Sequence, residues 1–194
     1  ILDAVDAFAR EHLSDRLVVA VHIRGNEHAD ERGYFIEGGV LGIEYYFREI
    51  DAALRRHPEA IVLCASDGAH HIAAVKKRYG ERVVSYEAKR LTEEEEHIGV
   101  QNLQLENKAV LGDDVIIETL LLSRADILIH GPSNVVTAAL IFAPKMPHVN
   151  VYVRYGKWLP KQRHYARRSW GSAKLALSKK FPALYSRAKK TLGR

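Results

Sequence analysis

The sequence predicts an α/β fold in which an open parallel sheet carries helices on both of its faces. Apolar stretches such as 17–23 and 60–65 are continuous rather than interrupted by a polar residue at every second position. Such continuity is typical of parallel strands that are covered on both sides. Stretches with helical spacing alternate with these strands along the chain. The hydrophobic share of 47% in 194 residues supports a packed core in one domain, or in two small ones at most.

Ten elements are expected, and helices alternate with strands throughout. In chain order they are a helix at 1–12, a strand at 17–23, a helix at 41–56, a strand at 60–65, a helix at 68–79, a strand at 82–86, a helix at 111–124, a strand at 126–130, a helix at 133–143 and a strand at 148–153. The chain begins inside the first helix and without an initiator Met, so we expect a fragment of a longer protein. Asp67 follows the second strand, and we expect it to act mainly as a helix cap.

The first strand ends in the most informative motif of the chain. Its apolar residues lead into Val21-His22-Ile23-Arg24, and the chain then enters the charged, Gly-bearing loop 25–40. Open α/β sheets bind ligands outside the carboxyl ends of their strands. A guanidinium at that place suits a phosphate, because its planar fork can donate two parallel charge-assisted hydrogen bonds. Arg24 is therefore either a phosphate ligand or an arginine that caps the strand end or pairs with a carboxylate.

The expected helix at 111–124 contains a carboxylate in apolar surroundings. Glu118 stands between Val115-Ile116-Ile117 and Leu120-Leu121-Leu122. An unpaired carboxylate is costly to bury, so the position favours a ligand contact over the alternative of a solvated helix glutamate.

The last expected helix begins after a strand and the turn His130-Gly131-Pro132. Ser133 and Asn134 stand at its start. Free backbone N–H groups, a hydroxyl and the positive end of a helix together suit an anion. Simple N-capping is the alternative reading of the same residues, and the two readings are compatible.

These segments together resemble a known family. The motif at His22–Arg24, the carboxylate at Glu118, the run Leu120–Asp126 and the turn Gly131–Asn134 follow one another as in fucosyltransferases of the nodulation protein Z type, the α-1,6-fucosyltransferases and the O-fucosyltransferases. The resemblance covers about residues 1–153. It implies the donor-binding, C-terminal lobe of an enzyme with two Rossmann-like lobes (the GT-B arrangement), the other lobe being absent from this chain.

The resemblance also implies roles for individual residues. Arg24 would hold the β-phosphate of GDP-fucose and stabilise the charge that develops on GDP, so that no metal or other cofactor is needed. His22 would lie against the nucleoside, unless it is a strand-end histidine bonded to backbone. Glu118 would accept hydrogen bonds from N1–H and the amine of guanine. The family often has a second arginine where this chain has Gly25, a departure that bears on the α-1,6 linkage.

Transfer with inversion needs a group that deprotonates the acceptor hydroxyl. Glu37 falls where the family has a functional glutamate, and Asp30 and Glu31 compete with it in a longer loop. The implied reaction is inverting transfer of fucose from GDP-fucose to a glycan hydroxyl. The alternatives are another sugar-nucleotide-dependent transferase on the same scaffold, and a non-catalytic nucleotide- or glycan-binding module.

Several sequence features bear on the cellular compartment of the protein and on metal binding. Cys64 lies in an apolar strand and is expected to be a buried, inert thiol, as in a reducing compartment. No signal segment or membrane-spanning apolar run is found, which favours a cytoplasmic location. The acidic run Glu93–Glu96 is expected to begin a solvated helix, because nothing near it has the spacing of metal ligands.

The end of the chain is strongly basic. Fourteen of the 29 Lys and Arg residues, and none of the 24 Asp and Glu residues, follow Asp126, so we expect an anionic partner for this end. We divide the chain into a nucleotide-sugar-binding domain at 1–153 and a basic helical tail at 154–194. The tail could pack across the other lobe or lie on an anionic membrane surface, which would make the protein peripheral at the membrane. Nucleic acid is not expected, because no binding motif or aromatic platform is present.

Overall fold

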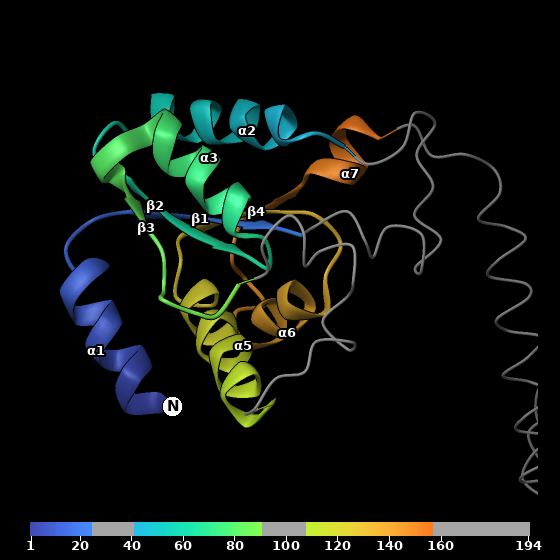
Figure 1. Cartoon of the computed structure of the whole chain (residues 1–194). Coiled ribbons are helices and arrows are strands. Elements are labelled where there is room, and N and C mark those ends of the chain that lie inside the picture. The colour runs from blue at the N-terminus through green and yellow to red at the C-terminus, as the bar shows by residue number, and fades with distance from the viewer. Residues whose placement is uncertain (25–40, 91–107, 157–194) are drawn as a thin grey trace, which may run out of the picture.

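A computed structural model describes residues 1–24, 41–90 and 108–156 (Figure 1). In chain order the elements are α1 (Leu2–His12), β1 (Val18–Ile23), α2 (Ile43–Arg56), β2 (Ile61–Ser66), α3 (Ala69–Tyr79), the 3₁₀ helix η2 (Gly80–Arg82), β3 (Val83–Val84), α5 (Lys108–Leu122), β4 (Ile127–His130), α6 (Asn134–Phe142), β5 (His148–Asn150) and α7 (Val151–Tyr155). Each of the ten expected elements has a counterpart. Within the described ranges, no helix combines the length and the apolar character that crossing a membrane requires.

The strands form one parallel sheet in the order β3-β2-β1-β4-β5. The central strand β1 pairs with β2 on one side and with β4 on the other, so that Val19 is the register partner of both Val62 and Ile127. All six residues of β1 are buried. The predicted α/β fold with a Rossmann-like open parallel sheet is thereby confirmed.

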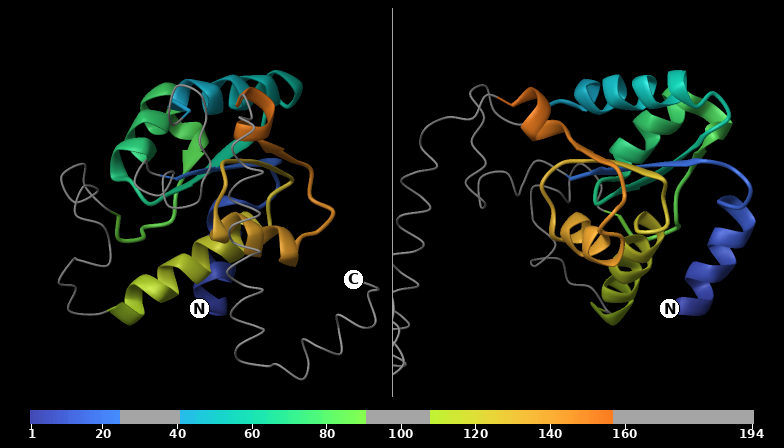
Figure 2. Two further views of the ribbon diagram at one scale, coloured as in Figure 1. Left: turned by 90° about the vertical axis from the view of Figure 1, so that its right-hand side faces the viewer. Right: turned by 180° about the vertical axis from the view of Figure 1, so that it is seen from behind.

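Alternate residues of β1 face two separate cores. Val18 and Ala20 pack with side chains of α1, α5 and α6, whereas Val19 and Val21 pack with side chains of α2, α3 and α7. This alternation follows from the two-residue repeat of a strand. Helices therefore cover both faces of the sheet, with α2, α3 and α7 on one side and α1, α5 and α6 on the other (Figures 1 and 2).

The order of the strands reverses between β1 and β4. From the carboxyl end of β1 the chain continues to α2 on one face, while from the adjacent end of β4 it continues to α6 on the opposite face. Two neighbouring strand ends whose chains leave to opposite faces define a topological switch point, which is where open α/β sheets bind ligands.

Two strands are shorter than the sequence predicts. β3 covers only Val83–Val84, because η2 occupies the residues before it. The strand expected at 148–153 ends at Asn150, whose Oδ1 accepts hydrogen bonds from the backbone N–H groups of Tyr152 at 3.0 Å and Val153 at 3.2 Å. This cap starts α7 inside an apolar run that is read equally well as a strand, so the prediction was wrong beyond residue 150.

The segment after α5 is tied to the sheet through Asp126 and to α1 through Arg124. Asp126 Oδ2 accepts a hydrogen bond from the backbone N–H of Val18 at 2.8 Å. Arg124 forms an ion pair with Asp6 on α1. These contacts lie at the amino-terminal edge of the strands, away from the switch point.

Candidate functional site

Two histidines lie side by side at the switch point. His22 on β1 is the register partner of His130 on β4, and both side chains lie on the face of the sheet that α5 and α6 cover, two residues beyond Ala20 and Leu128 respectively. His22 is 5% exposed and His130 is 4% exposed. His130 is held by the backbone oxygen of Gly131 at 2.9 Å and by Nδ1 of His148 at 3.0 Å.

His22 carries a polar atom that the described residues leave unsatisfied. Its Nδ1 is buried, and no described residue meets it with hydrogen-bonding geometry. Burial lowers the pKa of His22 to about 4. Asp67 and the residue's own backbone oppose that shift, and Arg24 and His130 reinforce it. The ring is therefore neutral at pH 7, with one donor and one acceptor nitrogen. A buried polar atom without a partner is unusual enough to indicate a ligand contact.

Arg24 directly follows β1 and is half-buried. Its positive charge is among the causes that lower the pKa of His22, so the guanidinium lies close to that imidazole. The cation and the neutral ring thus occur together at the end of the central strand.

The start of α6 is built around Ser133. Ser133 Oγ accepts a hydrogen bond from the backbone N–H of Val135 at 3.2 Å, so the predicted N-cap is present. The preceding Gly131 lies tightly against α2, since a Cβ at that position would stand 2.5 Å from the hydroxyl oxygen of Tyr46. Asn134 is the first residue of the helix and is exposed. An anion contact at this helix end stays a prediction.

Glu118 is held by a partner that the sequence analysis missed. Its Oε1 accepts a hydrogen bond from Arg90 Nη2 at 2.9 Å, and the two side chains are only 13% and 9% exposed. The alternative of a solvated helix glutamate is therefore wrong. Burial raises the pKa of Glu118 to about 7, although Arg90 opposes the shift.

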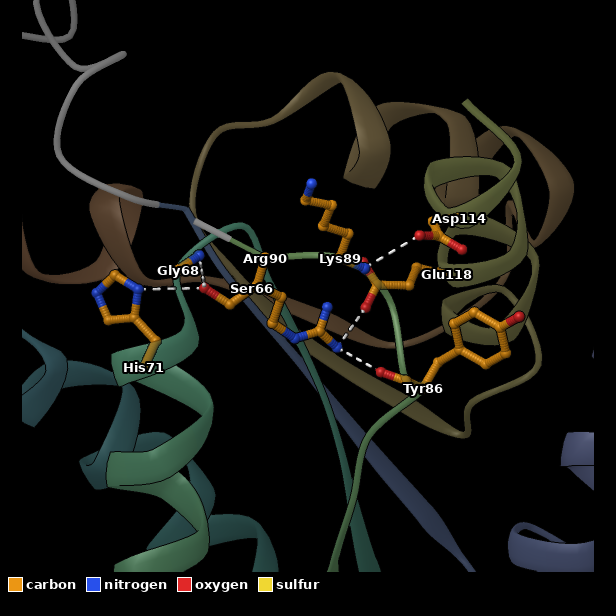
Figure 3. A network of polar contacts seen from close by, with 8 residues as sticks. All are labelled: Ser66, Gly68, His71, Tyr86, Lys89, Arg90, Asp114 and Glu118. Carbon is orange, nitrogen blue, oxygen red and sulfur yellow. Dashed lines mark hydrogen bonds and ion pairs between the residues drawn. The ribbon is translucent and has the colours of Figure 1, made fainter. Parts of the chain in front are cut away.

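The segment after β3 is fastened to α5 at two places (Figure 3). Arg90 Nη2 also donates to the backbone oxygen of Tyr86 at 2.6 Å. The backbone N–H of Lys89 donates to Asp114 Oδ2 at 3.0 Å. Asp114 and Glu118 are four residues apart and therefore lie on one side of α5. The signal that could have found Arg90 is the buried carboxylate itself, which requires a cation from another segment.

Asp67 is not the helix cap that the sequence predicts. The N-cap residue of α3 is Gly68, with no side-chain capping bond, and Ser66 Oγ accepts the N–H of Gly68 at 3.2 Å. The charge of Asp67 instead acts on several groups around the switch point. Its negative charge is one of the causes that raise the pKa values of Tyr46 and Glu118. The same charge opposes the lowering of the pKa values of His22 and His71 by burial. Asp67 thus lies among residues of β1, α2, α3 and α5.

A second polar cluster adjoins this turn. His71 Nδ1 lies 3.1 Å from Ser66 Oγ, and its Nε2 lies 3.1 Å from Nε2 of His70. Burial lowers the pKa of His71 to about 4. Among the described residues, no group of three or more His, Cys, Asp or Glu side chains is arranged to hold a metal ion. Glu37 and its competitors Asp30 and Glu31 lie outside the described residues, as does the run Glu93–Glu96.

Comparison by sequence finds no matching family model and no matching curated protein. Solved structures of two fucosyltransferases are similar in fold. NodZ α-1,6-fucosyltransferase co-crystallised with GDP is 19% identical, with a TM-score of 0.45, over 77% of this chain and 42% of that one. NodZ from Bradyrhizobium is 16% identical, with a TM-score of 0.45, over 77% and 43%. POFUT1 in complex with GDP-fucose is 14% identical, with a TM-score of 0.47, over 77% and 45%. The chain spans less than half the length of each.

Proposed function

We propose that this chain is the nucleotide-sugar-binding lobe of a glycosyltransferase, with GDP-fucose as its donor. The observation that carries the proposal is the switch point between β1 and β4: a buried imidazole and an arginine stand at the end of β1, and a capped helix starts after the adjacent end of β4. In a sheet of this topology that edge is the ligand-binding edge. The further step, inverting transfer of fucose to a glycan hydroxyl, is supported by the order of the motifs.

The diphosphate would lie between Arg24 and the start of α6. Arg24 supplies a permanent positive charge with a planar fork of donors. The start of α6 carries the positive end of the helix dipole, which favours an anion there. An arginine and a helix end can stabilise the charge that develops on GDP, so we propose that no metal ion is needed.

The base would lie toward α5, where Glu118 provides a buried acceptor. Guanine presents N1–H and its exocyclic amine side by side, and a carboxylate can accept from both. Adenine has no such pair of donors. Glu118 would thus select GDP, and the buried nitrogen of His22 would contact the nucleoside or its phosphate.

The remaining parts of the proposal rest on sequence alone. Glu37 is the proposed general base, and the glycan acceptor would be bound together with a second lobe. The basic tail at 154–194 is proposed to attach the protein to an anionic membrane surface, which would make a cytoplasmic protein peripheral at that membrane.

A thermal-shift screen tests the donor assignment directly. GDP, UDP, ADP and their sugar conjugates are added at increasing concentration, and the unfolding temperature is followed. A nucleotide at 100 times its dissociation constant stabilises a protein by about 2.7 kcal/mol. We expect stabilisation by GDP and GDP-fucose that ADP and UDP do not match. A preference for UDP would indicate another sugar-nucleotide transferase, and no response to any nucleotide would refute a nucleotide site.

A further inference from the structure

The ion pair between Arg90 and Glu118 is unusual in its burial. Each side chain is about nine-tenths buried, and the two atoms in contact, Arg90 Nη2 and Glu118 Oε1, are 2.9 Å apart. Removing two charges from water is expensive and is repaid only when the geometry is good. A pair that merely fastens a loop to a helix can be made at the surface at far lower cost. The burial of this pair therefore calls for an explanation beyond attachment.

The position of Arg90 is fixed from both sides. Its guanidinium is bonded to the backbone oxygen of Tyr86 as well as to Glu118, and the neighbouring Lys89 is bonded through its backbone to Asp114. Figure 3 shows the guanidinium between the end of β2, at Ser66 and Gly68, and the side of α5 that carries Asp114 and Glu118. The pair thus lies near the carboxyl edge of the sheet, where Asp67 acts on both Glu118 and His22.

The ion pair places the hydrogen-bond donors of Arg90 beside the hydrogen-bond acceptors of Glu118. An arginine has five N–H donors, of which only those on Nη2 are engaged among the described residues. Glu118 uses Oε1 for Arg90, and its Oε2 accepts no hydrogen bond from any described residue. A carboxylate has about four acceptor positions, so the contacts with the described residues leave capacity on both partners.

This arrangement matches the Watson–Crick edge of guanine. That edge presents the acceptor O6, then the donor N1–H, then the donor amine. Adenine presents an amine where guanine has O6, and it would place donor against donor at the guanidinium. We propose that Arg90 is a second base-reading residue, which donates to O6 of guanine and positions Glu118 to accept from N1–H and the amine. This inference rests on the proposed function and specifies how its site selects guanine.

The ion pair with Arg90 also controls the protonation of Glu118. Glu118 must be ionised to accept from both donors, and its pKa near 7 reflects burial opposed by Arg90, with Asp114 and Asp67 raising it further. Cys64 on β2 lies within the electrostatic reach of both partners but is held neutral by a raised pKa. Without Arg90 the pKa of Glu118 would rise, so guanine binding would require a higher pH.

The test compares Arg90→Met with Arg78→Met, which removes a partly exposed ion pair between Arg78 on α3 and Asp51 on α2. Binding of GDP, of IDP and of the diphosphate of 2-aminopurine riboside is measured by calorimetry from pH 6 to pH 9. IDP keeps O6 and lacks the amine, whereas 2-aminopurine lacks both O6 and the N1–H donor and keeps only the amine. We expect Arg90→Met to weaken GDP and IDP by roughly tenfold or more, the usual worth of one good base contact, and to move the midpoint of the pH profile upward. Binding of the 2-aminopurine nucleotide at high pH and all properties of Arg78→Met should match the wild type.

Arg90→Lys keeps the experiment decisive if Arg90→Met does not fold. A lysine keeps the charge beside Glu118 but is a single point donor, so GDP should weaken while the midpoint of the pH profile stays in place. Wild-type affinity and an unchanged profile in a folded Arg90 variant would overturn the role of Arg90 and leave a guanine-selective site intact. Equal binding of GDP, ADP and UDP by the wild type would overturn the proposed function and this inference together.

Discussion

His22 and His130 are register partners on adjacent parallel strands, and the strand order of the sheet reverses between them. His130 is fully engaged by Gly131 and His148, whereas Nδ1 of His22 is buried without a partner among the described residues. The two imidazoles occupy paired positions on adjacent strands, but the described residues satisfy the hydrogen-bonding groups of His130 and not Nδ1 of His22. The unsatisfied one lies beside Arg24 on the central strand, which supports a ligand at that strand rather than at β4.

Replacing His22 by Phe separates a ligand contact from a packing role. Phe fills a similar volume and removes the unsatisfied nitrogen, and such an exchange is nearly neutral or stabilising when no partner is lost. We expect the free energy of unfolding at pH 7.5 to stay within about 1 kcal/mol of the wild type. Nucleotide affinity, measured by calorimetry on the same samples, should fall. A large loss of stability with unchanged affinity would make His22 a core residue only.

The pH dependence of stability should differ in sign between His22 and Glu118. The pKa of His22 is lowered from 6.5 to about 4, so its neutral form stabilises the protein above pH 6.5 and this stability is lost as the pH falls through 4. The pKa of Glu118 is raised from 4.5 to about 7, so its neutral form stabilises the protein below pH 4.5 and this stability is lost as the pH rises through 7.

The two contributions oppose each other over nearly the same range. Urea unfolding between pH 4 and pH 7.5 should therefore give a flatter profile for the wild type than for either variant. His22→Phe should make stability fall with rising pH, and Glu118→Gln should make it rise, each by at most about 3.5 kcal/mol at roughly 1.4 kcal/mol for each unit of pKa. Parallel profiles for all three proteins would contradict these assignments.

Glu118→Gln also tests base selection. The amide nitrogen would face the donors of guanine, so we expect GDP to lose its advantage over ADP and UDP in a thermal-shift assay. Asp114→Asn, one turn earlier on α5, is the matched control: among the described residues, the Asp114 carboxylate accepts from the backbone of Lys89 rather than from Arg90. Loss of its charge should lower the pKa of Glu118 without removing the Glu118 carboxylate. Glu118→Gln should also remove the part of the pH dependence of GDP binding that the Asp114 variant retains. Equal stabilisation of wild-type protein by all three nucleotides would remove Glu118 from the site.

Binding of GDP should survive chelation. The proposed site neutralises the diphosphate with Arg24 and the start of α6, and no step of binding uses a divalent ion. We expect the same dissociation constant by calorimetry in EDTA and in Mg²⁺ or Mn²⁺. Loss of binding in EDTA that either ion restores would show that a metal completes the site.

Sequence patterns predicted the sheet better than the site. Continuous apolar runs identified β1, β2 and β4, because a parallel strand buried on both faces leaves a clear signature. The strand at 148–153 was overextended, since an apolar run does not reveal that Asn150 turns its side chain to cap α7. The contact between Arg90 and Glu118 joins residues 28 positions apart, and only the path of the chain after β3 brings them together. Burial of Glu118 was predictable from its neighbours, but its partner was not.

Arg24 provides the sharpest separation of a phosphate ligand from a structural ion-pair residue. If the phosphate lies between Arg24 and the start of α6, Arg24→Ala should weaken GDP by about 2 kcal/mol or more, which is roughly 30-fold, as expected for a hydrogen bond to a charged group. Guanosine has no phosphate and should bind the variant and the wild type equally. Arg24→Lys should restore only part of the affinity, because a point charge cannot reproduce the planar fork.

Stability of the free protein supplies the control for Arg24. Arg24 is half-buried and follows the carboxyl end of β1, so if its main role is to hold the phosphate, unfolding in urea without ligand should change little in Arg24→Ala. Arg124→Ala, which breaks the ion pair with Asp6 at the opposite edge of the strands, should leave the affinities for GDP and guanosine unchanged. If Arg24→Ala instead unfolds the free protein while its folded fraction binds GDP normally, Arg24 stabilises the fold and the phosphate must be held elsewhere.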